Sequence, residues 1–571
     1  MNIEMNYKRW LNSPLVKQQD KDILKKMSVE EKNDAFYKNV EFGTAGMRGI
    51  LGPGTNRLNE FTVRKATVGF ALYLLEKYPN ALEAGVVIAH DNRHFSREFT
   101  LQSAKVFNEF GIKAYIFDSL RPTPELSFAV RKMKAVGGIM ITASHNPKEY
   151  NGYKVYDENG CQLVPHKINR LVEIISSLPS ELDVEYTPTK IKGKTITLGQ
   201  EIDDEYVKLV EGIALNKKIR KTNFKIVFTP NHGTAYVNGM RIFKDLGYDV
   251  YPLLKQCTPD PDFSNTLSPN PEDDRSFIEP IKYAKEIGAK LIVMTDPDGD
   301  RCGLACLNKQ KEYQTFTGNQ SAAMLLDYIL TYKKLNNMPL DNHVIYNTIV
   351  TSPLGEKIAK EFGLKCESFL TGFKFIGDRI DYYEKNGGPT FEFGYEESYG
   401  CLIAPFARDK DGLQAITLYS EMANYYDKKK MSLDMVWDMI GEKYGYHLDE
   451  VYNLPFIGPE GEAKMKILMD TLHSNPFIVV DDNPVVRVED YLISKSFTKG
   501  KNGIKEKAIT LPKSNVVKLI FKDHSYIAVR PSGTEPKVKF YIGVVSNKKE
   551  VDNKKRVKAL LDGLKLVLEL D

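Results

Sequence analysis

Short apolar runs alternate with longer amphipathic stretches along most of this 571-residue chain. Five of the runs are short and rich in valine and isoleucine: Ala84–Ala89, Gly138–Thr142, Lys225–Thr229, Lys290–Thr295 and His343–Thr348. Runs of this kind are typical of strands buried in parallel sheets. Helical patterns lie between them, for example at 61–76 and 276–287. Repeated alternation of strand and helix predicts three doubly wound α/β domains with mixed sheets.

The last part of the chain shows a different pattern. Three segments, 515–521, 525–529 and 537–545, are predicted as antiparallel strands, and a charged helix is expected from Lys548 onward. This pattern predicts a smaller α+β domain at the C-terminal end. The length suggests about three to five domains. We place four of them at 1–211, 212–312, 313–445 and 446–571.

Composition and charge narrow the class of protein. The formal net charge is +4 and 42% of the residues are hydrophobic, so nothing requires nucleic acid or an anionic membrane as a partner. Six cysteines without paired spacing favour a reducing compartment. The polar N-terminus lacks the apolar segment of a signal peptide, and no stretch approaches the roughly 20 apolar residues of a membrane span. A soluble cytoplasmic protein is therefore expected.

Polar clusters follow the apolar runs, at the strand ends where open α/β sheets bind ligands. The first cluster, ITASHNPKEYNGYKVY, places Ser144 just past a predicted strand. His145 follows at once, and Lys154 lies ten residues further on. A serine near a base is the minimum set of groups for covalent catalysis, although a Ser-His-Asn turn can also simply start a helix. The G-x-S-x-G sequence of α/β hydrolases is absent, so a hydrolase triad is not indicated.

The second cluster, TDPDGDR, is acidic. Asp296, Asp298 and Asp300 alternate, so three carboxylates can converge on one cation, and hard oxygen ligands suit Mg²⁺ or Ca²⁺. An EF-hand loop needs glycine at its sixth position and glutamate at its twelfth, but those positions are Arg301 and Leu307 here. The cluster therefore predicts a magnesium loop, with an acidic turn that binds no metal as the alternative.

Two further clusters suit a sugar and a phosphate. FEFGYEESYG places Glu396 and Ser398 after a strand, where a carboxylate and a hydroxyl can accept from and donate to sugar hydroxyls. Lys410 offers a cation a short way downstream. VRPSGTEPKVK combines Arg530 with two hydroxyl groups and a glycine turn, which together can hold a phosphate group. A β-turn with a surface arginine explains this last cluster equally well.

Taken in order, the four clusters resemble the serine, metal, sugar and phosphate loops of the α-D-phosphohexomutase superfamily. The resemblance covers nearly the whole chain. Shorter segments support it: GTAGMRG (43–49), HDNR (90–93), RPTP (121–124), TPNHGT (229–234), PDPDF (259–263), PNPE (269–272) and TGFK (371–374). The loop order, the length and the early GTAGMRG are most similar to the larger phosphoglucomutase branch, which also includes phosphopentomutases. The resemblance implies four domains around one central cleft, each supplying one loop.

The resemblance also implies roles for single residues. Ser144 would be the phosphorylated residue, and Lys154 would be the general base, kept neutral by a lowered pKa, with Arg48 and His145 beside it. The ligands of Mg²⁺ would be a phosphoserine oxygen of Ser144 and the carboxylates of Asp296, Asp298 and Asp300. The substrate would be held by Arg301, Thr371, Gly372, Glu396, Ser398, Lys410, Arg530, Ser532, Gly533, Thr534 and Lys539.

The implied activity is that of an enzyme that interconverts glucose 1-phosphate and glucose 6-phosphate, with glucose 1,6-bisphosphate as intermediate and activator. Its partners would be small sugar phosphates. The same chemistry on mannose, ribose, deoxyribose or glucosamine phosphate stays open, as does the oligomeric state. An alternative of another class is a non-catalytic sugar-phosphate sensor or scaffold. Such a protein would usually show a broken site, whereas every reactive side chain of the resemblance is present here.

Overall fold

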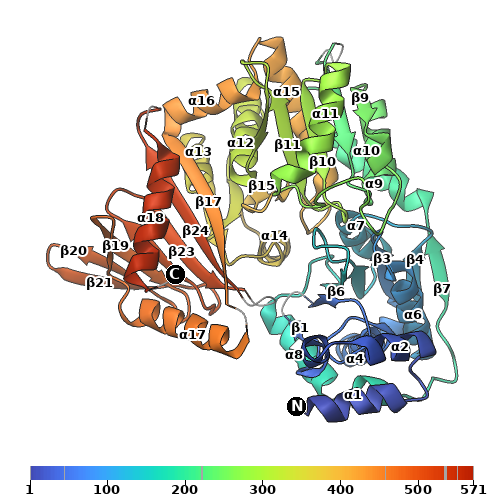
Figure 1. The fold of residues 1–571 in the computed structure, drawn as a ribbon. Helices are drawn as coiled ribbons and strands as arrows, with labels where there is room; N and C mark the ends of the chain where they lie inside the picture. The colour runs from blue at the N-terminus through green and yellow to red at the C-terminus, as the bar shows by residue number, and fades with distance from the viewer. Residues whose placement is uncertain are drawn as a thin grey trace. The chain divides into compact units, whose positions relative to one another are not determined.

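The computed structural model describes residues 2–43, 46–219, 223–456, 458–532, 537–549 and 551–569 (Figure 1). The chain forms two compact units. The first comprises Met1–Gly318 and Phe373–Ser432, and the second comprises Asn319–Gly372 and Leu433–Asp571. Among the described residues, no helix combines the length and the apolar character needed to cross a membrane.

The first sheet of the first unit carries the serine cluster. Its strand order is β1-β2-β6-β5-β3-β4-β7. Strands β5, β3, β4 and β7 run parallel, whereas β6, β2 and β1 are antiparallel additions at one edge, so the sheet is mixed. The strands are β1 (Phe42–Gly43), β2 (Gly46–Ile50), β3 (Val86–His90), β4 (Ala114–Phe117), β5 (Gly137–Ile141), β6 (Tyr150–Asp157) and β7 (Thr195–Leu198).

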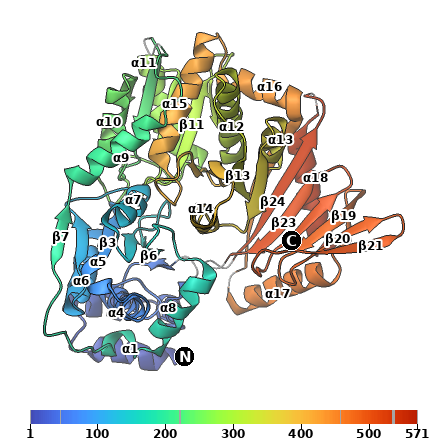
Figure 2. The ribbon, with the colours of Figure 1, turned by 180° about the vertical axis from the view of Figure 1, so that it is seen from behind.

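Helices cover both faces of this sheet, because the buried strands are apolar on both sides. Ile139 of β5 faces the main cluster formed with three helices, whereas Gly138 lies against Val130 of the helix on the other face. The first three helices are α4 (Glu60–Lys77), α6 (Ser96–Glu109) and α8 (Pro165–Ser177), and the fourth is α7 (Thr123–Met133). Figure 2 shows the same layers from behind.

Three further helices precede this domain: α1 (Ile3–Asn12), α2 (Gln18–Lys26) and α3 (Val29–Phe36). They pack around Trp10, which is fully buried against Phe36 and Phe61, and the Trp10 indole donates to Glu181. The end of α3 is joined to the main domain, because the amide of Asn56 donates to its Ala35 carbonyl. The N-terminal helices therefore brace the segment that follows β2.

The second sheet, also in the first unit, carries the acidic cluster. Its order is β12-β11-β10-β8-β9, in which β10, β8 and β9 are parallel and β11 and β12 are antiparallel. The strands are β8 (Lys225–Thr229), β9 (Asp249–Pro252), β10 (Leu291–Thr295), β11 (Cys302–Leu307) and β12 (Tyr313–Phe316). The helices are α9 (Gln200–Gly212), α10 (Tyr236–Asp245), α11 (Ile278–Ile287) and α15 (Gly412–Lys428). The acidic loop joins β10 to β11, at the carboxyl end of a fully buried strand.

The chain after the second sheet contributes to both units. In the second unit, β13 (His343–Thr348) and β14 (Lys365–Phe369) pair in parallel, and α12 (Gly318–Leu335) and α13 (Leu354–Glu361) belong to the same stretch of chain. In the first unit, α14 (Lys374–Asn386) leads to the antiparallel pair β15 (Thr390–Tyr395) and β16 (Cys401–Leu402). The sugar cluster occupies the turn between these last two strands.

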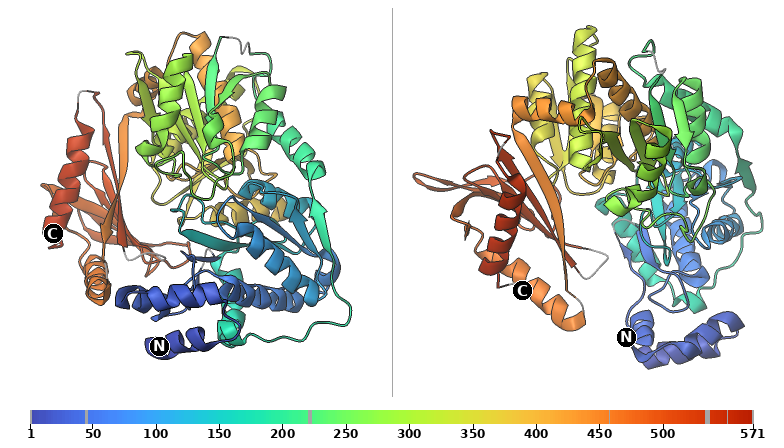
Figure 3. Two further views of the ribbon diagram at one scale, coloured as in Figure 1. Left: turned by 45° about the vertical axis from the view of Figure 1, so that its right-hand side comes forward. Right: turned by 45° about the horizontal axis from the view of Figure 1, so that its top comes forward.

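The C-terminal part of the second unit, which begins with α16 (Leu433–Tyr444), is an antiparallel sheet of order β17-β24-β23-β22-β19-β20-β21, with β18 paired to β19. Its strands are β17 (Tyr446–Pro455), β18 (Val479–Val480), β19 (Asn483–Asp490), β20 (Lys495–Gly500), β21 (Gly503–Ala508), β22 (Val517–Phe521), β23 (Tyr526–Pro531) and β24 (Lys537–Ser546). Helices α17 (Gly458–Ser474) and α18 (Asn553–Val567) share one apolar core with this sheet (Figure 3). The predicted fold class is confirmed: three α/β domains with mixed sheets and a C-terminal α+β domain.

Candidate active site

The serine cluster connects two antiparallel strands. Ser144 lies three residues past β5, and the chain then returns as β6, in which Lys154 pairs with Met140. Arg48 on β2 pairs with Gly152. Since side chains alternate along a strand, Arg48 and Lys154 lie on the same face of the sheet. The turn therefore leads into a strand, and the alternative that it starts a helix is wrong.

Ser144 has a left-handed backbone, with φ of 52°, and is 2% exposed. This conformation is uncommon for a residue with a Cβ and costs of order 1–3 kcal/mol when the surroundings do not compensate. The backbone N–H of Ser144 donates to Thr142 Oγ1 at 2.7 Å. Thr142 Oγ1 in turn donates to Asp91 Oδ2 at 2.7 Å. The turn is thus tied to a buried carboxylate.

Arg93 holds the same turn from the other side. Its guanidinium donates to the carbonyls of Ser144 and Pro147, both at 2.7 Å, and to that of Asn146. The Arg93 side chain is fully buried, and Asp91 lies 3.3 Å away as its counter-charge. The two residues come from the HDNR segment, whose role the sequence did not reveal. They fix the backbone of the loop that presents Ser144.

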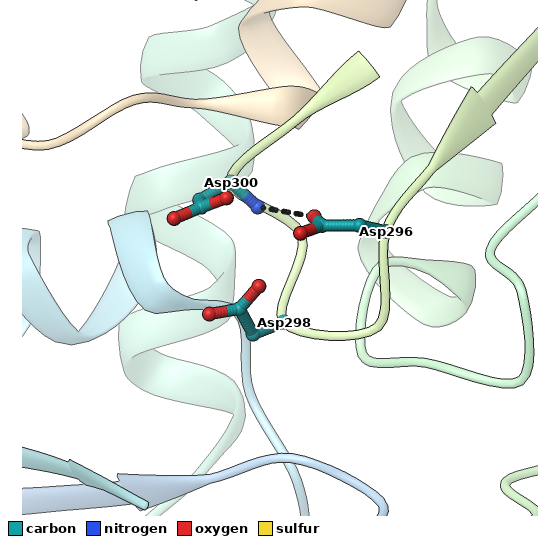
Figure 4. Close-up of side chains that lie close together, drawn as sticks. All are labelled: Asp296, Asp298 and Asp300. Atoms are coloured by element: carbon teal, nitrogen blue, oxygen red, sulfur yellow. Dashed lines mark hydrogen bonds between the residues drawn. The ribbon is translucent and has the colours of Figure 1, made fainter. Parts of the chain in front are cut away.

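The three aspartates of the acidic loop are buried and close together (Figure 4). Their ligand-type oxygens all lie within 4.8 Å of one another. The amides of Asp300 and Arg301 donate to Asp296 Oδ1 at 3.1 and 3.0 Å, so the loop curls around the Asp296 carboxylate. This local folding follows from the alternating sequence, in which the chain turns at Gly299 with φ of 70°.

The oxygens of this cluster fit a hard cation. Within the described part of the chain, Asp298 Oδ1 and Asp300 Oδ1 are buried and accept no hydrogen bond. Burial and the neighbouring charges of Asp298 and Asp300 raise the pKa of Asp296 well above its ordinary value. Open carboxylate oxygens in one small space are the donor set that Mg²⁺ prefers. The carboxylate triad can therefore hold a divalent cation, as the sequence predicts.

The serine and acidic loops meet. Ser144 Oγ donates to Asp296 Oδ2 at 2.8 Å. Lys154 Nζ lies 2.9 Å from Asp298 Oδ2 and 3.6 Å from Asp300 Oδ2. The predicted serine, lysine and three carboxylates thus form one buried group, although they come from separate domains.

In this arrangement the pKa of Lys154 shifts in the direction opposite to the predicted one. Burial alone would lower the pKa of Lys154, but the charges of Asp298 and Asp300 outweigh it and raise the pKa above its ordinary value. No feature of the sequence near Lys154 indicates that both carboxylates lie against the amine.

His145 and Arg48 also lie at the serine turn. His145 Nδ1 is 3.2 Å from Ser144 Oγ, and burial together with the charges of Arg301 and Arg48 lowers the pKa of His145 well below its ordinary value. The imidazole is therefore neutral. Arg48 donates to Asn146 Oδ1 at 3.0 Å. A neutral histidine beside a serine hydroxyl can accept or donate a proton.

The sugar cluster reaches the acidic loop through Lys410. Lys410 Nζ lies 3.2 Å from Asp300 Oδ2 and 3.7 Å from Glu396 Oε2. Arg301 pairs with Glu272 of the PNPE segment at 2.7 Å. Ser398 is half-buried, two residues beyond Glu396. The structure therefore brings Arg301, Glu396 and Lys410 to the same group of carboxylates.

The remaining predicted residues belong to the second unit. Arg530 on β23 lies directly opposite Lys539 on β24, so the two cations share one face of the sheet. The amide of Ser532 donates to the Lys537 carbonyl at 2.8 Å, which closes the strand pair. Thr371 Oγ1 is buried without a hydrogen-bond partner among the described residues, next to Gly372 with φ of 118°. Gly533 and Thr534 lie outside the described residues.

Three domain models of one known protein family match this chain in order along the sequence. The family described as phosphoglucomutase/phosphomannomutase matches this chain with its α/β/α domain I at residues 39–181, domain II at 204–309 and domain III at 317–440. The chain belongs to this family, and thereby to the α-D-phosphohexomutase superfamily that its motifs indicated.

Curated relatives narrow the class further. Phosphoglucomutase of Staphylococcus epidermidis (strain ATCC 12228) is 36% identical over 527 residues, which cover 92% of this chain and 94% of the relative. Phosphoglucomutase of Staphylococcus aureus (strain MRSA252) is 36% identical over 530 residues, covering 92% and 93%. These relatives confirm the prediction of an enzyme of the phosphoglucomutase type.

Solved structures share the fold at lower identity. Parafusin, a phosphoglucomutase from Paramecium described as an exocytosis-sensitive phosphoprotein, gives a TM-score of 0.66 at 18% identity and covers 93% of this chain and 94% of its own. N-acetylphosphoglucosamine mutase of Aspergillus fumigatus, in complex with GlcNAc-6P and magnesium, gives 0.51 at 13% identity and covers 93% and 96%. At these identities the likeness establishes the fold alone.

Proposed function

We propose that this chain is a phosphoglucomutase that interconverts glucose 1-phosphate and glucose 6-phosphate through a phosphorylated Ser144. The observation that carries the proposal is the 2.8 Å contact between Ser144 Oγ and Asp296, inside a group of three buried carboxylates and Lys154. A serine hydroxyl among carboxylates that fit a divalent cation suits phosphoryl transfer, because the cation can offset the charge of a phosphate placed on that serine. The names of the curated relatives support glucose phosphates as substrates.

The proposed reaction has two transfers that balance. The free hydroxyl oxygen of a sugar monophosphate attacks the phosphorus of phosphoserine 144, and the bond from phosphorus to Ser144 Oγ breaks as the new P–O bond forms. Lys154, neutral once a cation engages Asp298 and Asp300, would take the proton of the sugar hydroxyl. The same proton would then pass to the leaving oxygen, so that Ser144 ends as a hydroxyl and Lys154 returns to its neutral form. The product, glucose 1,6-bisphosphate, turns over and returns its other phosphoryl group to Ser144, which releases the isomeric monophosphate.

Mg²⁺ would be held by Asp296, Asp298 and Asp300 with an oxygen of the phosphoserine. When bound, it would offset the charge of the transferring phosphoryl oxygens and engage the carboxylates whose charge raises the pKa of Lys154. His145, neutral and 3.2 Å from Ser144 Oγ, would orient the serine oxygen. The magnesium in the complex of the Aspergillus fumigatus mutase supports this choice of cation.

The substrate would be bound at two ends. Arg530, Ser532, Gly533, Thr534 and Lys539 would hold the phosphate that does not react, since a guanidinium and hydroxyl groups suit phosphate oxygens. The sugar hydroxyls would be bound by Arg301, Thr371, Gly372, Glu396, Ser398 and Lys410.

We keep the four predicted domains at 1–211, 212–312, 313–445 and 446–571. A cytoplasmic location is supported by the six cysteines, all described and none in a disulfide.

The intact mass of the purified chain tests this proposal. Glucose 1,6-bisphosphate is added to the dephosphorylated protein, and the expected result is a gain of one phosphoryl group that maps to Ser144. Coupled assays then compare glucose 1-phosphate with mannose 1-phosphate and ribose 1-phosphate, and glucose is expected to give the highest kcat/KM. Absence of a phosphoryl group on Ser144 would overturn the mechanism. Phosphorylation with a preference for mannose or ribose would overturn only the choice of sugar.

A further inference from the structure

A threonine beside the first sheet is hydrogen-bonded to the acidic loop. Thr123, the first residue of α7, donates from Oγ1 to Asp298 Oδ2 at 3.0 Å. Its backbone N–H also donates to the carbonyl of Asp298 at 2.8 Å. Thr123 is fully buried, so water does not compete for either bond. One residue thus fixes both the main chain and the side chain of one predicted metal ligand.

Both side-chain hydrogen bonds to the Asp298 carboxylate go to the same oxygen. Oδ2 accepts from Thr123 and from Lys154 Nζ at 2.9 Å. Oδ1 is buried and accepts no hydrogen bond among the described residues. A carboxylate held through one oxygen by two donors cannot turn freely, so the other oxygen keeps its direction. Asp298 belongs to the same cluster as Asp296 and Asp300, and Oδ1 is its one oxygen without a hydrogen bond among the described residues.

The contact sits on a rigid support. Pro124 lies in the first turn of α7, which fixes the start of the helix, and the amide of Arg121 donates to the carbonyl of His90. A side chain at position 299 would lie 2.8 Å from Pro122 Cβ, which allows only glycine at this point of the acidic loop. The RPTP segment and the loop are therefore fitted to one another, and Thr123 supplies the polar contact.

We propose that Thr123 is a positioning residue for the cation site: its hydroxyl holds the carboxylate of Asp298 so that Oδ1 faces the bound metal. The inference rests on the proposed magnesium site. Thr123 touches neither the cation nor the substrate in this role. Loss of a group that orients a metal ligand typically weakens metal affinity about tenfold to a hundredfold.

Two variants separate positioning from packing. Thr123→Val keeps the size and the backbone N–H but deletes the hydroxyl, whereas Thr123→Ser keeps the hydroxyl. Thr100→Val is the matched control, since Thr100 is also fully buried and its hydroxyl donates only to the Ser96 carbonyl within α6. Each full-length protein is titrated with Mn²⁺, with free Mn²⁺ followed by electron paramagnetic resonance, and its thermal unfolding is recorded without metal.

The expected result is a Kd for Mn²⁺ raised about tenfold or more in Thr123→Val and close to the unsubstituted value in Thr123→Ser and Thr100→Val. Equal affinity in Thr123→Val and Thr100→Val would overturn the inference. So would an equal loss in Thr123→Ser, because the hydroxyl would then not be the cause. If the unsubstituted chain bound no Mn²⁺, the proposed cation site itself would fail, and this inference with it.

Discussion

Ser144 Oγ donates a hydrogen bond of 2.8 Å to Asp296 Oδ2, across 152 residues of sequence. The serine follows a strand of the first sheet, and the aspartate follows a strand of the second. In both sheets the candidate site residues come after the carboxyl end of a strand, where open α/β sheets bind their ligands. The contact therefore makes one site from two domains, and most of the chemistry proposed here depends on it.

Replacement of Ser144 by alanine removes the proposed phosphoryl carrier. We expect Ser144→Ala to lose the mass gain from glucose 1,6-bisphosphate and to lower kcat by roughly four orders of magnitude or more, as for other catalytic nucleophiles. Ser177→Ala is the control, because its hydroxyl only donates to the Ile174 carbonyl at the end of α8. Turnover of Ser144→Ala within a factor of ten of the control would exclude a phosphoserine mechanism.

Metal removal should act through the carboxylate triad. A chelator is expected to abolish activity, and added Mg²⁺ should restore it. A ligand at a hundred times its Kd stabilises the folded state by about 2.7 kcal/mol, so Mg²⁺ should raise the Tm of the unsubstituted chain. Asp300→Asn should lose most of this increase, since a neutral amide is a poorer ligand for a hard cation. The matched variant Asp274→Asn, outside the triad, should keep it; an equal rise in Tm for both variants would contradict the assignment.

Replacement of Arg93 should disturb the backbone conformation of the serine loop. Arg93→Lys keeps the charge beside Asp91 but cannot reach all the carbonyls that the guanidinium now serves. We expect a loss of about 2–3 kcal/mol in the free energy of unfolding, measured with urea, because buried carbonyls lose their donor. A fall of at least tenfold in kcat is also expected, because Ser144 is no longer held in place.

The exposed pair of Arg170 with Glu76 supplies the control for that experiment. Arg170→Lys should leave the free energy of unfolding close to that of the unsubstituted chain, as is usual for exposed ion pairs. An unchanged kcat in Arg93→Lys, with stability lowered, would mean that Arg93 serves the fold and not the position of Ser144.

The opposed cations of β23 and β24 lead to a prediction on substrate binding. Arg530→Lys should raise the KM for glucose 1-phosphate about tenfold with a smaller change in kcat, because a lysine cannot make the bidentate phosphate contact proposed for Arg530, which the ground and transition states would share. Lys539→Arg should keep or lower the KM. Steady-state kinetics at saturating Mg²⁺ measure both. A fall in kcat at constant KM would place Arg530 in the chemical step instead.

The sequence identified the loops well because each follows a buried apolar strand, such as Leu291–Thr295 before the acidic loop. It did not predict β6, since its alternating polar and aromatic residues, YNGYKVYD, resemble a loop. Lys154 was therefore found only through its motif, and its two carboxylate neighbours come from a distant part of the chain. Such contacts set the pKa of a buried amine, and they cannot be predicted from the residues next to it in sequence.

In the terminal domain, too, only some of the strands could be predicted from the sequence. Strands β22 to β24 were predicted from their apolar residues, whereas β21, GIKEKA, is exposed throughout and carries no alternation of apolar and polar residues. Thr123 and Arg93 lie in the RPTP and HDNR segments, which the resemblance singled out without giving them a role. Their hydrogen bonds to Asp298 and to the serine loop become visible only when the two sheets are folded.

A histidine of the terminal domain should make stability depend on pH. His473 Nδ1 lies 2.7 Å from Asp490 Oδ2 and Nε2 lies 2.9 Å from Asn515 Oδ1. Two acceptors around one ring favour the doubly protonated imidazolium. The hydrogen bond to Asp490 is the main cause that raises the pKa of His473 above its ordinary value of 6.5.

Because the folded pKa is the higher one, the folded state binds this proton more tightly than the unfolded state does. The stabilisation is fully present below about pH 6.5 and is lost as the pH rises through the folded pKa. We expect it to be about 1 kcal/mol, less than the roughly 1.5–3 kcal/mol usual for a hydrogen bond to a charged group, because solvent screens the partly exposed ring. Urea unfolding between pH 6 and pH 9 should show the decline in the unsubstituted chain and in the exposed control His166→Gln. His473→Gln should remove it, and an equal decline in His473→Gln would assign the pH dependence to another group.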